Sequence, residues 1–307
     1  MSFLTTFNQI LVLFILLMVG FTVRRLNLVD SSFSKNLSNF VFNIVFPAMI
    51  IYSMDYPFSF KTLIDGIWLI VISLGVVIFS GVVSIVTVKL LKVDRLSENV
   101  YHFGILFSNF SFMGFPVTSA LYGKEGMFYT SIFIILLRLL FNTLGVVIMQ
   151  RGQENTVKID FKSIINPPIV AVVIGLIMFL FSLDFPKPIS MSISMIASTI
   201  TPLGMIIVGL ILANEKFSEM FSNYKVYVVS FIRLVFLPLC VLLVLKVLGF
   251  ESLMIGIPVI ITAMPMAASA SILAEKYNGN SYLGAQCVFI STLLSIITIP
   301  LIALLVI

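Results

Sequence analysis

The chain has 307 residues, of which 60% are hydrophobic and 10% charged, and its formal net charge is +5. Soluble domains carry about 25% charged residues, so this composition excludes a water-soluble fold and places the chain in lipid. The positive charges are few and scattered, which excludes a nucleic-acid-binding surface. The apolar runs continue for about twenty residues without alternation, and this favours membrane-spanning helices over barrel strands.

The apolar runs predict an all-α integral membrane protein with ten transmembrane helices, forming a single transporter unit over residues 1–307. In chain order the predicted spans are residues 7–23, 36–54, 66–91, 99–122, 128–149, 164–182, 188–213, 224–247, 253–275 and 282–306.

The charges of the loops predict the orientation. Twelve lysines and arginines lie in loops after odd-numbered spans, and four lie in the other loops. Positive loops stay cytoplasmic, so both termini are expected outside the cell membrane. The remaining two basic residues, Arg138 and Arg233, lie inside spans.

Prolines follow similar patterns in the two halves of the chain. Span two carries Ser38–Pro47 and span seven carries Ile193–Pro202, and each ends a polar-dotted stretch with a proline. Span four carries Met113–Pro116, and span nine carries Thr262–Pro265. These pairs predict that spans four and nine are broken helices at matched positions.

The pairing predicts an internal repeat. The first five spans, in residues 1–150, correspond to the second five, in residues 164–307. Because five is an odd number, the second copy must be inverted in the membrane. An inverted repeat with paired broken helices is typical of secondary transporters, whose substrate site lies at the breaks.

Pro116 and Pro265 each lack the amide donor that a helix interior needs. Backbone groups freed in the membrane must line a cavity or find protein partners, and half-helix N-termini there offer partial positive charge to an anion. Ordinary proline kinks are the alternative. Asn109 lies two helical turns before Pro116, on the same face. Its amide can donate to a carboxylate or make an interhelical hydrogen bond.

The two arginines inside spans are candidates for a functional role, because a charge at this depth is costly. Arg138 can recognise a substrate carboxylate or donate to carbonyls freed at the breaks, and we favour the structural role. Arg233 can support the crossover in the same way or extend toward the cytoplasmic surface. Asn142 lies one turn after Arg138 on the same face.

Two stretches carry a resemblance to a known family. Asn109–Pro116, with the letters NFSFMGFP, and the following Ala120–Gly123 resemble the fourth-helix motif of the auxin efflux carrier family. This family includes the plant PIN-type carriers and bacterial malate- and malonate-type permeases. Met264–Ala267 and Ser295–Pro300 resemble its C-terminal half. The short central loop, Arg151–Ser163, is similar to bacterial members.

The resemblance implies an elevator transporter that forms a homodimer, with a fold like that of the bile-acid symporters and NhaA. Helices 1, 2, 6 and 7 would form the scaffold, and helices 3–5 and 8–10 the transport domain. We expect the substrate contacts to come from Asn109, Gly114, Phe115, Pro116, Ala263, Met264, Pro265 and Met266. We expect crossover support and charge from Arg138, Asn142 and Arg233. No metal or cofactor is expected.

These observations favour a permease or efflux carrier for a small organic anion, such as a mono- or dicarboxylate, in the membrane of a bacterial cell. A sodium-coupled bile-acid-type symporter is the alternative. An intramembrane enzyme is disfavoured, because one histidine cannot supply a His-Glu-x-x-His zinc motif and the span interiors lack a carboxylate pair. A channel is disfavoured by the inverted repeat.

Overall fold

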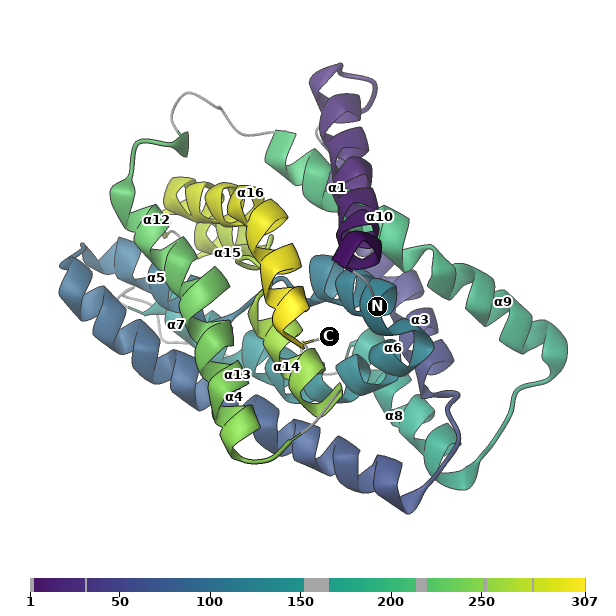
Figure 1. The fold of residues 1–307 in the computed structure, drawn as a ribbon. Coiled ribbons are helices and arrows are strands. Elements are labelled where there is room, and N and C mark those ends of the chain that lie inside the picture. The colour runs from purple at the N-terminus through teal and green to yellow at the C-terminus, as the bar shows by residue number, and fades with distance from the viewer. Residues whose placement is uncertain are drawn as a thin grey trace.

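The computed structural model describes residues 3–30, 32–151, 166–213, 220–250, 253–277 and 279–306, with side chains from residue 7 onward. Most of the predicted central loop and the first two residues of predicted span six lie outside these ranges. The described residues are helical (Figure 1). The elements are α1 (Phe3–Arg25), α2 (Phe33–Phe40), η1 (Val41–Val45), α3 (Phe46–Met54), α4 (Phe60–Leu91), α5 (Arg95–Leu106), η2 (Phe110–Gly114), α6 (Phe115–Leu140), η3 (Phe141–Gly145), α7 (Val146–Gln150), α8 (Pro167–Phe181), α9 (Lys187–Ser198), α10 (Ile200–Ala213), α12 (Tyr224–Phe231), η5 (Ile232–Phe236), α13 (Leu237–Val247), α14 (Leu253–Thr262), α15 (Ala270–Lys276) and α16 (Ser281–Val306).

Seven helical stretches among the described residues are long and apolar enough to cross a membrane. They are Phe7–Arg25, Phe33–Met54, Phe60–Leu91, Phe110–Gln150, Lys187–Ala213, Tyr224–Val247 and Ser281–Val306. The shorter apolar helices α8 and α14 occupy predicted span six and the first half of predicted span nine. The all-helical membrane protein is therefore confirmed, whereas ten crossings remain a prediction.

Polar side chains in the loops set where the helices begin. The hydroxyl of Ser59 accepts a hydrogen bond from the Thr62 amide at 3.0 Å and caps α4. The carboxylate of Asp94 accepts from the Ser97 amide at 3.1 Å and caps α5. Its hydrogen bonds with Ser97 hold the pKa of Asp94 below the usual value. Each cap satisfies one of the amides that a helix N-terminus leaves without a partner.

Three of the π-helical turns, η1, η2 and η5, end two residues before a proline. Pro47, Pro116 and Pro238 are each the second residue of the α-helix that follows such a turn. Proline lacks an amide and its ring clashes with the carbonyl four residues earlier, and a π turn opens the ladder at that point. The wider turn therefore lets each long helix continue past its proline.

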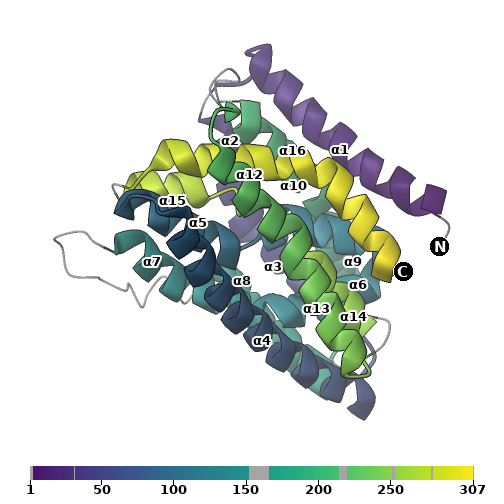
Figure 2. The same ribbon diagram turned by 60° about the vertical axis from the view of Figure 1, so that its left-hand side comes forward.

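The helices pack in two groups. In one, α1 packs along α10, and α3 packs against α8 and α9. In the other, α4 packs against α5 and α6, while α16 packs against α12, α14 and α15. Both figures show α1 and α4 on opposite sides of the molecule (Figures 1 and 2). Both figures also show the start of α1 near the end of α16.

Glycines bring α1 and α10 into backbone contact. A Cβ at Gly20 would collide with the Ile206 carbonyl, and one at Gly209 would collide with the Leu17 carbonyl. Small residues permit such close helix crossings in membranes, where packing replaces the hydrophobic effect as the force that joins helices. The pair α1–α10 is therefore a closely packed unit of the fold.

Candidate functional site

Two helices break at the centre of the molecule, and their broken ends pair with each other. The first break separates α5 from η2, and the second separates α14 from α15. The Asn109 amide donates to the Pro265 carbonyl at 2.7 Å, and the Ala267 amide donates to the Phe107 carbonyl at 3.2 Å. Ser108 and Met266 form an antiparallel bridge between these two bonds. The extended segments therefore satisfy each other's buried backbone groups.

The position of the first break corrects one prediction. Pro265 lies in the second break, as predicted, but Pro116 lies inside the helix beyond the first break. The first break falls at Phe107–Asn109, because Asn109 starts a new helix and η2 accommodates Pro116 without interruption. Gly123 interrupts α6 with a non-helical backbone, at a φ of 62°.

Asn109 connects the first break to the helix that follows. Its backbone carbonyl accepts from the Met113 and Gly114 amides, and its side-chain oxygen accepts from the Phe112 amide at 3.2 Å. The residue is only 3% exposed, and its side-chain Nδ2 has no hydrogen-bond partner. An unpartnered buried amide costs free energy, so this donor is available to a ligand.

Arg138 is buried on α6 with one polar contact. Its Nη2 donates to the Ser111 hydroxyl at 3.2 Å, while its Nη1 has no hydrogen-bond partner. The guanidinium lies over three phenyl rings, with its carbon 5.6 Å from the centre of Phe42, 5.0 Å from Phe46 and 5.8 Å from Phe110. Cation–π contacts hold the group in place, but within the described ranges its charge has no counter-ion.

Arg233 is also buried, on η5, and its guanidinium donates to two carbonyls of the crossover. Its Nη1 donates to the Ile105 carbonyl at 2.7 Å, and its Nε donates to the Met264 carbonyl at 3.2 Å. With only 3% of its surface exposed, the side chain does not extend to the membrane surface. Of the two roles considered for Arg233, the geometry agrees with support of the crossover.

A cavity of about 250 Å³ is lined by both residues that carry an unpartnered donor, Asn109 and Arg138. It is lined by Ser38, Asn39, Phe42, Ser108, Asn109, Phe110, Ser111, Phe112, Arg138, Phe141, Asn142, Ile211, Ala267, Ala268, Ser269 and Ile272. Its wall combines apolar side chains with a few polar groups, which is typical of small-molecule sites. The helix that begins at Asn109 also directs the positive end of its dipole here.

The cavity contains only some of the predicted site residues. Asn109, Arg138 and Asn142 line it. The other predicted contact residues do not: Gly114, Phe115, Pro116, Ala263, Met264, Pro265 and Met266. These seven are buried in helix contacts and in the crossover itself. Gly114, for example, faces Ile261 of α14 so closely that a Cβ would lie 2.8 Å from the Ile261 side chain.

The structure adds polar residues that the sequence prediction did not select. Ser111 holds Arg138, and Ser38, Asn39, Ser108 and Ser269 line the cavity. Ser111 lies within the motif of span four, and Ser38 and Asn39 lie in the polar-dotted stretch before Pro47. The signal was therefore present as polar residues inside spans, but their convergence depends on the crossing of the helices.

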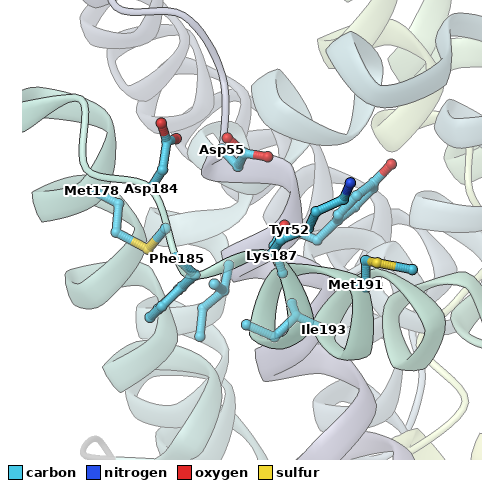
Figure 3. A pocket seen from close by; sticks show the side chains of 10 residues that line it. Tyr52, Asp55, Met178, Asp184, Phe185, Lys187, Met191 and Ile193 are labelled. Carbon is cyan, nitrogen blue, oxygen red and sulfur yellow. The ribbon is translucent and has the colours of Figure 1, made fainter.

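A second hollow, of about 280 Å³, lies between α3 and the α8–α9 connection (Figure 3). Figure 3 shows the carboxylates of Asp55 and Asp184 at one edge and the side chains of Phe185 and Ile193 at the other. Lys187 is its only basic residue. Asp55 is paired with Lys124 at 2.9 Å, and the charges of Asp184 and Lys187 offset each other. The lining thus has no excess of positive charge for an anion, so this hollow is a poorer candidate. Among the described residues, no group of His, Cys, Asp and Glu could hold a metal ion.

Comparisons with known proteins agree with a membrane carrier. The model of a family described as "Membrane transport protein" matches residues 5–303. An uncharacterized transporter of Methanothermobacter thermautotrophicus is 26% identical over 302 residues, which cover 98% of each chain. One from Methanocaldococcus jannaschii is 22% identical over 303 residues and 96% of each chain. The uncharacterized transporter YfdV of Escherichia coli is 25% identical over 200 residues and 62% of each chain.

Proposed function

This chain belongs to the membrane transport protein family, the family of the auxin efflux carriers, and from that premise we propose that it carries a small organic anion across the cell membrane. Its relatives are transporters by name, with no stated substrate. The nature of the substrate therefore has to come from the chemistry of the cavity at the crossover.

One observation supports an anion above all. The cavity contains a buried guanidinium whose charge is not balanced by an acid, and the single ion pair among the described residues is Lys124–Asp55, at another place. A buried charge is costly unless it is paired and hydrogen-bonded. A carboxylate bound between Arg138 and Asn109 would satisfy both orphaned donors at once. The cavity volume is below the roughly 300–1,000 Å³ of pockets for drug-sized ligands, so the anion would be small.

The packing of the helices supports an elevator mechanism. The predicted scaffold spans correspond to α1, α2–α3, α8 and α9–α10, and these elements pack together. The predicted transport domain corresponds to the second packing group. The cavity lies between the two, because Asn39 and Ile211 belong to the first group, while Asn109 and Arg138 belong to the second. A site at such a boundary can move with one group past the other.

The remaining features of the proposal follow from the sequence. They are ten crossings in an inverted repeat of five and five, both termini outside, and a homodimer. The crossed breaks at Asn109 and Pro265 support the repeat, because each break falls in the fourth span of its half. A sodium-coupled symporter is the alternative, and measuring whether uptake requires sodium distinguishes the two functions.

Uptake into proteoliposomes tests the proposal. We would measure uptake of a panel of mono- and dicarboxylates, with and without sodium and with and without a proton gradient. Arg138→Gln should weaken binding of the transported anion by about 10-fold or more, because a hydrogen bond to a charged group contributes about 1.5–3 kcal/mol. Arg138→Lys should retain part of the affinity, since it keeps the charge but loses the planar fork.

Lys187→Gln is the matched control for this experiment. It also removes one positive charge, but from the second hollow in Figure 3. It should transport like the unmodified protein. An Arg138→Gln protein with unchanged affinity would contradict the assignment of the cavity. Uptake that requires sodium would support the symporter instead.

A further inference from the structure

The two buried arginines differ in how their charges are balanced. Arg138 meets one hydroxyl and three phenyl rings. Arg233 meets two backbone carbonyls, both of which lie at the C-terminal ends of broken helices. No ion pair is formed by either arginine within the described ranges. The charge of Arg233 is therefore met by the negative partial charge of backbone carbonyls.

The Ile105 carbonyl has lost its helical partner to the crossover. In a continuous helix it would accept from the amide four residues later, which is that of Asn109. The Asn109 amide donates to the Pro265 carbonyl instead. Arg233 supplies the missing donor at 2.7 Å. The guanidinium thus replaces a backbone hydrogen bond that the first break removes.

The Met264 carbonyl lies just beyond the end of α14. Arg233 donates to it at 3.2 Å through a second nitrogen, so one planar group joins the ends of α5 and α14. Each helix C-terminus carries about −0.5 elementary charge. Two such ends together offset a charge of about +1, which is that of one guanidinium.

We propose that Arg233 is the fixed cation of the crossover: it balances the two helix C-termini and joins the two breaks, so that no mobile cation is needed there. As a positioning residue, it acts through the Ile105 and Met264 carbonyls and does not line the cavity. Of the two buried arginines among the described residues, Arg138 is then the one whose charge is left for an anionic ligand. This proposal rests on hydrogen bonds and burial and does not depend on the proposed transport function.

The test is the thermal stability of the purified full-length protein without substrate, in sodium, lithium or choline chloride at equal ionic strength. The unmodified protein should have the same Tm in all three salts. Arg233→Met should lower the Tm by about 5 °C or more, because it leaves two buried carbonyls without a donor. Added guanidinium should then raise the Tm of this variant but not the Tm of the unmodified protein. Neutral urea should raise neither.

Leu234→Ala is the matched control, because Leu234 is adjacent on η5 and 1% exposed. It should lower the Tm by leaving a cavity, with no response to any cation. If Arg233→Met also fails to respond to guanidinium, sodium and lithium, the residue has a packing role and the proposal is wrong.

Two further measurements keep the result interpretable. If Arg233→Met does not fold, Arg233→Lys keeps the charge and should be purified with a Tm that guanidinium does not raise. In the unmodified protein, a Tm that depends on sodium would overturn the proposal directly, because the place of the cation would then not be filled by Arg233. None of these outcomes depends on uptake, so failure here leaves the anion site of Arg138 untouched.

Discussion

At the scale of single residues, the contacts that Asn109 makes within the fold can be separated from its proposed contact with a ligand. Its side-chain oxygen caps the helix that begins at η2, and its backbone amide forms the crossover with Pro265. Its Nδ2 makes no hydrogen bond within the protein. The first two interactions belong to the fold, and only the third is free for a ligand. A substitution that removes Nδ2 and keeps the oxygen therefore tests the ligand function alone.

Asn109→Asp is such a substitution. It keeps an oxygen for the Phe112 amide, and it brings a carboxylate into the cavity that contains Arg138. We expect a Tm equal to or above that of the unmodified protein, because the new carboxylate can balance the buried guanidinium. We expect the affinity for the transported anion to fall by about 10-fold or more, since a donor is lost and the cavity is no longer positive. Isothermal titration and a thermal melt measure both quantities.

Asn109→Ala is the comparison for this prediction. It removes the cap together with the donor, and loss of an N-cap costs about 0.5–2 kcal/mol. It should therefore lose stability as well as affinity. An Asn109→Asp protein that binds the anion as tightly as the unmodified chain would show that Nδ2 does not contact substrate.

Sequence reasoning reached part of this site and missed the rest for a physical reason. Asn109 and Arg138 were selected because a polar or charged side chain inside a membrane span needs an explanation. Ser111 and Ser269 were not selected, because serine can satisfy itself by donating to its own helix backbone. Their role follows only from the crossing of two helices whose sequences are about 150 residues apart. The charge of Arg233 was noticed, but its carbonyl partners depend on where the helices end.

At the scale of elements, prolines and glycines fix how the helices run and how closely they approach. The prolines were visible in the sequence and were interpreted as breaks. Pro116 is instead accommodated by a π turn within a continuous helix, while the actual break lies at Phe107–Asn109. Periodicity cannot show this difference, because both arrangements have the same apolar residues. The close packing of α1 on α10 was also not predicted, since a glycine does not identify its partner.

The glycine contacts give a prediction for Gly209 of α10. A Cβ there would collide with the Leu17 carbonyl and lie 2.7 Å from the Phe21 amide nitrogen, so one helix must move away from the other. Gly209→Ala should therefore lower the Tm of the purified protein, although alanine favours a helix by about 1 kcal/mol over glycine.

Gly75 of α4 provides the matched control. A Cβ at this position would have nothing within 4 Å. Gly75→Ala should leave the Tm unchanged or raise it, because only the gain in helix propensity remains. Equal melting temperatures for the Gly209→Ala and Gly75→Ala proteins would contradict the close contact between α1 and α10.

At the scale of the whole molecule, the proposed elevator requires that the two packing groups slide past each other. Ser53 of α3 and Ser131 of α6 lie at this boundary, with their hydroxyl oxygens 2.9 Å apart. Cysteines at both positions, in a chain without Cys240 and Cys287, should form a disulfide on oxidation. Uptake should then stop and should recover on reduction, because the bond joins the two groups.

A second cysteine pair serves as the control for this experiment. The Oγ of Ser84 on α4 lies 3.1 Å from the Nδ1 of His102 on α5, and both helices belong to the same packing group. Their disulfide should leave uptake largely unchanged. Uptake that continues with Ser53 and Ser131 replaced and cross-linked would exclude sliding at this boundary.

The different balance of the two arginines also has an electrical consequence. Both Arg138 and Arg233 belong to the group that would move, but the charge of Arg233 is offset by the helix ends it joins. The buried interior of the empty moving group would therefore carry about one unbalanced positive charge, that of Arg138, and a bound monovalent anion would cancel it. Moving one elementary charge through 100 mV changes the free energy by about 2.3 kcal/mol. The membrane potential would thus act on the return of the empty carrier and leave the loaded step nearly unaffected. The rate of turnover would then depend on voltage, while the choice of transported anion would depend on binding at Arg138.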